Sequence, residues 1–148
     1  MNVVAAILTD EPIEAASPEF SAALAAAGLP TDDLDLPDRV FFRFRVDGET
    51  VGFGGYEACG ADVLLRSIVV LPRYRGRGFG RDIAASLAVR AGRGGARQAY
   101  LLTTTARVFF ERLGFRVIDR KTAPAPILAT REASALCPST APLLTKPL

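Results

Sequence analysis

The chain has 148 residues, among them 18 basic and 16 acidic side chains, and it contains no histidine. A chain of this length buries one hydrophobic core and is too short for two, so we expect a single domain over residues 1–148. The absence of histidine excludes Ser-His-Asp and Cys-His catalysis and most catalytic metal centres, and no metal site is expected.

The N-terminal residues predict a strand and then a helix. Residues 3–8 (VVAAIL) are apolar and partly β-branched, which is typical of a strand. The helix signals that follow are Ser17 as N-cap, Pro18 at the first helical position and Gly28 near the end. The acidic residues 31–38 (TDDLDLPD) then predict a loop or a short helical turn.

A three-stranded meander comes next. Residues 39–58 consist of two β-rich runs joined at Asp47-Gly48, a dipeptide that favours a tight hairpin turn. Residues 61–70 (ADVLLRSIVV) continue as a third strand, which ends before Pro72.

The second half of the chain alternates helices with strands. From Phe79, apolar residues recur at helical spacing, which predicts an amphipathic helix that lies on a sheet and ends in the sequence GRGG. Residues 97–105 predict a buried strand. Residues 106–114 predict a short helix with Gly114 at its C-terminal cap, and residues 115–120 predict another strand.

The C-terminal tail, residues 122–148, is rich in alanine and proline. One interpretation is a loosely attached extension. The interpretation we favour is an ordered tail, in which residues 127–136 form a helix that ends before Pro138 and residues 141–148 form a last edge strand.

Charge is divided unevenly along the chain. Residues up to Asp62 include 12 acidic and 3 basic side chains, whereas residues from Val63 onward include 4 acidic and 15 basic ones. The second half therefore favours anionic partners. Nucleic acid is one candidate, but most of the arginines between Arg73 and Arg97 lie on one loop and one helix. A compact, phosphate-bearing small molecule fits better, and no nucleic-acid partner is expected.

The cellular setting is expected to be the cytoplasm. No stretch approaches the roughly 18 apolar residues of a membrane span, and the N-terminus lacks the basic start of a secretory signal, so no membrane partner is expected. Cys59 and Cys137 have neither the number nor the spacing of a disulfide framework or a zinc site. Each is expected to be a small apolar filler.

The most informative stretch is VVLPRYRGRGFGRD, residues 69–82, between a strand and a helix. Gly76, Gly78 and Gly80 have no Cβ, so their backbone N–H groups can approach an anion closely and adopt a positive φ. The first N–H groups and the dipole of the following helix add positive partial charge. A pyrophosphate fits there, with arginines adding charge-assisted contacts. The spacing fits neither the Rossmann fingerprint nor the P-loop, which needs a lysine.

The pattern R-x-x-G-x-G, filled by Arg75, Gly78 and Gly80, resembles the acetyl-coenzyme A signature of the GNAT N-acetyltransferase superfamily. Downstream, residues 109–115 (FFERLGF) resemble its second cofactor element, F-[FY]-x-x-x-G-F. The resemblance covers essentially the whole chain. It implies an α/β (α+β) GNAT fold, with a mixed, mostly antiparallel central sheet that is splayed at the cofactor site and flanked by helices.

The resemblance also implies where acetyl-coenzyme A, the cosubstrate, binds. The sheet would open between residues 64–70 and 99–105 to admit the pantetheine arm, while residues 76–81 hold the pyrophosphate. Thr103 stands where many members have an asparagine that touches the cofactor. The run Ile68-Val69-Val70 also reads as a simple core strand. The cofactor-binding residues implied are Ile68, Val69, Val70, Arg75, Gly76, Arg77, Gly78, Phe79, Gly80, Arg81 and Thr103.

The implied reaction is attack of an amine on the acetyl thioester, which needs orientation, an oxyanion donor and removal of a proton. The backbone N–H of Val69 or Val70 is the candidate donor. Many relatives carry a glutamate on the strand that leads to the loop, but this chain has the run LLRS there. Glu57, on the preceding strand, is the nearest carboxylate and the candidate base, acting directly or through water. The alternative for Glu57 is an exposed strand charge.

Other roles in the site are open at this point. Phe110 stands where relatives often have the tyrosine that protonates the leaving thiolate. Either a hydroxyl among Thr103, Thr104 and Thr105 assists instead, or the thiolate, with a free-thiol pKa of ~8.5, leaves unassisted.

Arg66, with Ser67 beside it, is the candidate partner of a substrate carboxylate, and the alternative for Arg66 is a surface charge. Arg131 and Glu132 on the tail helix are open in the same way, and for both we favour a solvated face.

A resemblance of the tail implies which class of amine accepts the acetyl group. Residues 120–141 resemble the insert of small bacterial N-acetyltransferases associated with arsenic resistance and, more distantly, the acetylating domain of N-acetylglutamate synthases. This implies a small amino-acid-like amine, an arsenic-containing or toxic amino acid included. The alternatives are a protein or peptide N-acetyltransferase and a non-catalytic module that binds coenzyme A or nucleic acid. The oligomeric state stays open, with a homodimer among the alternatives.

Overall fold

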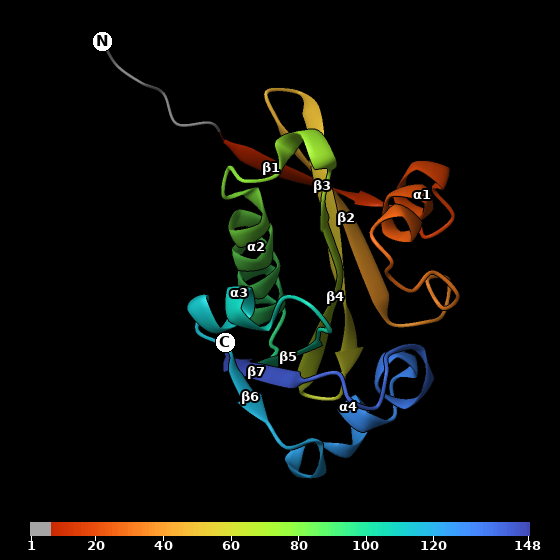
Figure 1. Ribbon diagram of the computed structural model, residues 1–148, viewed down its shortest axis with the longest axis vertical. Coiled ribbons are helices and arrows are strands. Elements are labelled where there is room, and N and C mark those ends of the chain that lie inside the picture. The colour runs from red at the N-terminus through yellow and green to blue at the C-terminus, as the bar shows by residue number, and fades with distance from the viewer. Residues whose placement is uncertain (1–6) are drawn as a thin grey trace.

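The computed structural model describes residues 7–148 and contains a seven-stranded sheet with helices on both faces (Figure 1). The strand order is β1-β2-β3-β4-β5-β7-β6, and every neighbouring pair is antiparallel except β4 and β5. The strands are β1 (Leu8–Ile13), β2 (Arg39–Val46), β3 (Glu49–Cys59), β4 (Asp62–Val70), β5 (Gln98–Leu102), β6 (Arg116–Ile118) and β7 (Leu143–Pro147). The mixed, mostly antiparallel sheet flanked by helices is therefore confirmed.

The helices divide between the two faces of the sheet. Figure 1 shows α2 and α3 on one side, and α1 with the blue helical turns that precede β7 on the other. The helices are α1 (Pro18–Ala26), α2 (Phe79–Arg93), α3 (Arg107–Arg112) and α4 (Ala125–Leu128), with short 3-10 turns at Pro72–Tyr74 and Arg120–Thr122 and a π-helical turn at Glu132–Leu136. Within residues 7–148, no helix combines the length and apolarity that crossing a lipid bilayer requires.

The first strand differs from the prediction, whereas the first helix agrees with it. Residues 3–6 of the predicted strand lie outside the described residues, and the strand that the structure shows, β1, pairs with β2 from Leu8 to Ile13. In α1, Pro18 is the first residue and Ser17 is the N-cap. The Ser17 hydroxyl oxygen accepts a hydrogen bond from the Phe20 backbone N–H at 3.4 Å, which satisfies one of the free N–H groups at the start of the helix.

The predicted hairpin joins β2 to β3. Asp47 and Gly48 have φ values of 51° and 78°, the left-handed conformation that a two-residue turn of this kind requires. Side chains alternate along β2, so that Phe42 belongs to the core under α2 whereas Phe41 lies 4.9 Å from the ring of Phe20 on α1. The sheet is therefore buried on both faces.

A bulge in β4 reverses which side chains face each side of the sheet. Gly55 pairs with Arg66 but Phe53 pairs with Val69, so two residues of β4 stand opposite Gly54. Ser67, in the bulge, has a φ of 58°. Because an extra residue shifts the alternation by one position, Val69 joins the core under α1 although it is three residues after Arg66, which lies on that same face.

The sheet opens next to this bulge, between the two parallel strands. Strands β4 and β5 pair only at Val63 with Ala99 and at Leu64 with Tyr100. Beyond Leu64 no further pairs join β4 to β5 within the described residues. This is the splay that the resemblance implied, and it leaves the C-terminal half of β4 without a neighbour on that side.

The tail is ordered, but two details of its prediction are wrong. Strand β7 is not an edge strand, because it lies between β5 and β6, and Leu143 and Leu144 are fully buried. The predicted helix 127–136 is also broken into α4 and the π-helical turn. At the break, the Thr130 hydroxyl donates to the Ile127 carbonyl at 2.8 Å and accepts from the Ala133 N–H at 3.2 Å, which replaces regular helical bonding.

Candidate functional site

Two adjoining cavities lie where the sheet opens. The first, of about 300 Å³, is bounded by residues 65–70 of β4, residues 101–103 at the end of β5, and Glu132 and Cys137 of the tail. The second, of about 550 Å³, lies over the glycine-rich loop and the start of α2. Both include Ile68, Val70 and Phe110 in their walls, so they form one continuous surface.

The glycine-rich loop has the conformation that its sequence predicts. Gly76 and Gly78 have φ values of 79° and 84°, and Gly78 is the N-cap of α2. Gly80 is helical, and a Cβ there would lie 3.3 Å from the ring of Phe109. Since the first N–H groups of a helix have no partner within it, the start of α2 presents free donors beside the second cavity.

The arginines of the loop are not equivalent. Arg75 and Arg81 line the second cavity, but Arg77 lines neither cavity, and its guanidinium lies 5.8 Å from the ring centre of Tyr74. The Nε of Arg75 donates to the Val70 carbonyl at 3.1 Å. The carbonyl of Val70, one of the residues implied to bind the cofactor, therefore already accepts a hydrogen bond from the chain.

The other predicted cofactor residues lie around the two cavities. Val69 and Thr103 line the first, Phe79 and Gly80 line the second, and Ile68 lines both. The Thr103 hydroxyl oxygen accepts a hydrogen bond from the Ala106 N–H at 2.9 Å, which leaves its O–H free to donate.

The residues that were considered for protonation of the leaving group differ in position. Thr103 and Thr105 line the first cavity, and Thr104 does not. Phe110 is buried and packs edge-to-face on Phe115, with ring centres 5.8 Å apart, and it lines both cavities without offering a proton.

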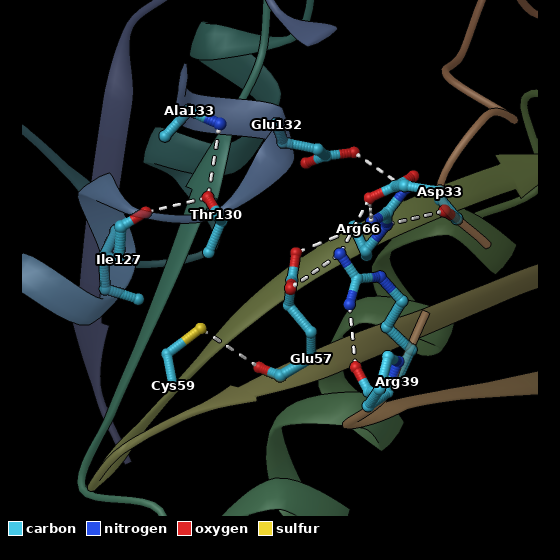
Figure 2. A network of polar contacts seen from close by, with 11 residues as sticks. Asp33, Arg39, Glu57, Cys59, Arg66, Ile127, Thr130, Glu132 and Ala133 are labelled. Carbon is cyan, nitrogen blue, oxygen red and sulfur yellow. Dashed lines mark hydrogen bonds and ion pairs between the residues drawn. The ribbon is translucent and has the colours of Figure 1, made fainter. Parts of the chain in front are cut away.

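Arg66 is the centre of a buried ionic network (Figure 2). Its guanidinium donates to both carboxylate oxygens of Asp33, at 2.5 and 2.6 Å, and its Nε donates to the Ser67 hydroxyl at 3.3 Å. Its side chain has no exposed surface, so the expectation of a surface charge is wrong. Arg66 lines the first cavity, but its N–H groups face carboxylates of the chain itself.

Glu57 lies on β3, the strand next to the one that carries Arg66, and lines neither cavity. Its carboxylate is 3.2 Å from Arg39 and 3.5 Å from Arg66, and the residue is only 5% exposed. The alternative of an exposed strand charge is therefore wrong. Burial raises the pKa of Glu57 by more than the nearby Arg39 and Arg66 lower it.

Glu132 corrects a further expectation. It was expected on a solvated face together with Arg131. Arg131 is exposed, but Glu132 is only 4% exposed and lines the first cavity. The break at Thr130 turns the carboxylate toward Arg66, at 3.5 Å. Burial raises the pKa of Glu132 to about 7, and the positive charge of Arg66 offsets only part of that effect.

Asp33, the carboxylate that holds Arg66, was not among the site residues expected from the sequence. Burial alone would raise the pKa of Asp33, but hydrogen bonds from Arg66 and Arg39 outweigh it and keep that pKa below its usual value. Four acidic residues occur in the segment TDDLDLPD, and nothing in the pattern separates Asp33 from the others. For Glu132 a signal existed, because it is one of only 4 acidic residues after Asp62 and stands among small apolar residues.

A model of the acetyltransferase (GNAT) domain family matches residues 37–117 of the chain, a segment that contains the glycine-rich loop and the opening of the sheet. No curated protein matches the sequence at a significant level.

Several solved acetyltransferase structures have a similar fold. N-acetylglutamate synthase from Neisseria gonorrhoeae, complexed with coenzyme A and N-acetyl-glutamate, superposes with a TM-score of 0.77 at 16% identity over 96% of this chain. The chain spans only 35% of that synthase chain. A putative acyl-CoA N-acyltransferase from Klebsiella pneumoniae gives 0.74 at 22% identity, and a Bacillus subtilis acetyltransferase in complex with coenzyme A gives 0.72 at 16% identity. Both matches cover 96% of this chain, together with 98% of the Klebsiella chain and 99% of the Bacillus chain.

Proposed function

Because the chain belongs to the GNAT acetyltransferase family, we propose that it transfers an acetyl group from acetyl-coenzyme A to the amine of a small amino-acid-like acceptor. The observation that carries the proposal is the opening between β4 and β5, with the glycine-rich loop at one end and Glu132 at the other. One end suits an anionic cofactor and the other suits a cationic amine.

The residues at the loop end fit coenzyme A. Gly76 and Gly78 leave the backbone uncovered in a left-handed conformation, and the start of α2 adds free N–H donors. Arg75 and Arg81 add positive charge along the same wall. We propose that these groups hold the pyrophosphate, and that Ile68, Val69 and Thr103 line the path of the pantetheine arm. When bound, acetyl-coenzyme A supplies an electrophilic thioester.

The register of β3 and β4 decides which backbone N–H faces the opening. The Leu71 N–H donates to the Val51 carbonyl at 2.8 Å, and by the alternation of an antiparallel pair the Val69 N–H then faces Phe53 of β3. The Val70 N–H faces the open side of β4, and Val70 lines both cavities. We propose that the Val70 N–H, rather than that of Val69, stabilises the negative charge that develops on the carbonyl oxygen, because a backbone donor held by a strand needs no reorganisation during the reaction.

The acceptor end supports a small amine. The first cavity measures about 300 Å³, at the lower end of the usual range for small-molecule sites, and the tail forms one of its walls through Glu132 and Cys137. The synthase to which the fold is similar was crystallised with N-acetyl-glutamate, which fits the same class of acceptor. An arsenic-containing or toxic amino acid belongs to this class as well, and only an acceptor screen can choose among its members.

The proposal is tested by thiol release from acetyl-coenzyme A across a panel of acceptors. Free amino acids, arsenic-containing amino acids, other small amines and short peptides are compared at equal concentration, and products are identified by mass spectrometry. We expect turnover with small amino-acid-like amines. Turnover only with peptides would replace this acceptor class, and thiol release without any acetylated product would contradict acetyl transfer altogether.

A further inference from the structure

Three carboxylates surround Arg66, and they differ in what they can reach (Figure 2). Both oxygens of Asp33 are occupied by Arg66, and one also accepts from Arg39 at 2.9 Å. Glu57 lies behind Arg66 and lines no cavity. Glu132 lines the first cavity together with Val69 and Thr103, and it is the one carboxylate in the walls of the two cavities among the residues that the structure describes.

Glu132 is also the least restrained of the three, with one ion pair against two for Glu57. Its contact with Arg66, at 3.5 Å, is an ion pair without a hydrogen bond, whereas Asp33 holds Arg66 at 2.5 and 2.6 Å. Within residues 7–148 the Glu132 carboxylate has no hydrogen-bond donor. Its oxygens are therefore available to a hydrogen-bond donor in the cavity, and an acceptor ammonium is such a donor.

The charges around Glu132 come from every element that faces it. Arg66 from β4 and Arg39 from β2 contribute two positive charges, while Asp33 from the loop after α1 and Glu57 from β3 contribute two negative ones. The thiol of Cys137, next to Glu132 in the wall, is neutral because burial raises its pKa to about 11. Arg120 adds a third positive charge, because its guanidinium donates to the carbonyl of Ala133, next to Glu132, at 3.2 Å. With Glu132 ionised the positive and negative charges balance, so the Glu132 carboxylate itself is the group in the cavity wall that attracts a cation.

From this geometry we infer that Glu132 is the general base that removes a proton from the acceptor ammonium. The inference rests on the proposed function and replaces Glu57 in that role. The residues of β4 that line the first cavity include no carboxylate, and the tail supplies one through Glu132.

Glu132 takes one proton from the ammonium, which leaves a neutral amine with a free electron pair. That pair forms the C–N bond to the acetyl carbon while the C–S bond breaks and its electrons leave with the sulfur. The second proton of the nitrogen goes to the sulfur, so that an amide and a thiol are formed. Glu132 then releases its proton to water, and the carboxylate is regenerated. A base whose pKa lies near the working pH is the most effective in such a step.

The test compares E132Q with E57Q and with E14Q, a control in which an exposed carboxylate remote from the cavities is replaced. For the wild type, kcat should rise with pH through a group titrating near 7. We expect E132Q to lose about 10²–10⁴-fold in kcat and to lose that limb of the pH profile, with the acetyl-coenzyme A Kd unchanged. E57Q and E14Q should keep the limb.

A second readout needs no activity. In the free protein with ¹³C-labelled glutamate carboxyls, one resonance should titrate near 7, and it should be missing from the spectrum of E132Q. If E132Q folds poorly, E132D serves instead, and it should keep the pH limb at a lower kcat because the carboxylate is retained but withdrawn.

Two results would overturn the inference. One is an E132Q enzyme with wild-type kcat and pH profile, and the other is loss of the limb in E57Q but not in E132Q. Either would leave the proposed function intact, because the wild type would still acetylate amines. Absence of acetyl transfer by the wild type would contradict the proposed function itself.

Discussion

Arg66 and Asp33 form a buried two-point ion pair that joins the opened strand β4 to the loop after α1. The two hydrogen bonds measure 2.5 and 2.6 Å, and neither side chain has exposed surface. Arg66 lines the first cavity, and its bonds to Asp33 fix the strand next to the bulge on the α1 side. Because Arg66 is held by the chain, it orients Glu132 and Ser67, and its N–H groups are not free for a carboxylate of the acceptor.

Removal of the Asp33 charge should destabilise the protein strongly. D33N leaves the Arg66 guanidinium buried without its main partner, and breaking a buried pair in this way costs about 3–5 kcal/mol. Urea unfolding at pH 7 measures the change. The control is D35N, since Asp35 is exposed in the same loop. Equal unfolding midpoints for the two variants would show that the ion pair contributes little.

The glycine at the N-cap of α2 should be required for cofactor binding. Gly78 has a φ of 84°, and a Cβ there would lie 3.3 Å from the Arg81 guanidinium, so G78V strains the loop that presents the free N–H groups. We expect the coenzyme A Kd to rise at least about tenfold, measured by calorimetry. G95V is the matched control, because Gly95 has a φ of 98° with nothing near its Cβ and lines neither cavity. It should lose stability but keep affinity.

Local signals predicted most of the fold. The hairpin at Asp47-Gly48, the cap at Ser17 and the glycine-rich loop depend on short stretches whose chemistry allows few conformations. The position of β7 could not be found in this way, since pairing between β5 and β6 is decided by contacts distant in sequence.

The acceptor end of the site was harder to predict for the same reason. Asp33, Arg66 and Glu132 meet from a loop, a strand and the tail, and none of them belongs to a local motif. A one-residue bulge and a break at Thr130 decide which way two of these side chains point. Glu132 was expected on the solvated face of one continuous helix over residues 127–136, and the structure breaks that helix at Thr130.

Loss of the Arg75 charge should weaken coenzyme A binding in a salt-dependent way. The hydrogen bond from Arg75 to the Val70 carbonyl holds the guanidinium at the second cavity, whereas the residue is exposed to solvent. A hydrogen bond to a charged group contributes about 1.5–3 kcal/mol, so R75Q should raise the Kd roughly tenfold or more at low salt.

The difference between R75Q and wild type should shrink as ionic strength rises, because exposed charges are screened. Titrations of coenzyme A at two salt concentrations measure it. R131Q removes an exposed arginine that lines neither cavity and serves as the control. An R75Q affinity that equals the wild-type value at low salt would contradict a role for Arg75 at the pyrophosphate.

The ionisation of Glu132 should make the protein less stable at higher pH. In the folded chain the Glu132 pKa is about 7, whereas an unperturbed glutamate has a pKa of 4.5, so the folded state holds this proton more tightly. The stabilisation is fully present below pH 4.5 and is lost as the pH rises through 7. Each pKa unit of difference corresponds to about 1.4 kcal/mol, which gives a loss of roughly 3 kcal/mol in the free energy of unfolding between pH 4 and pH 8.

E132Q has no such proton, so its free energy of unfolding relative to the wild type should increase by about that amount over this range. Urea unfolding of both proteins at a series of pH values measures the difference, and E14Q should follow the wild type throughout. Parallel curves for E132Q and wild type would mean that Glu132 ionises as an ordinary solvated carboxyl, and the cavity would then lack a base suited to neutral pH.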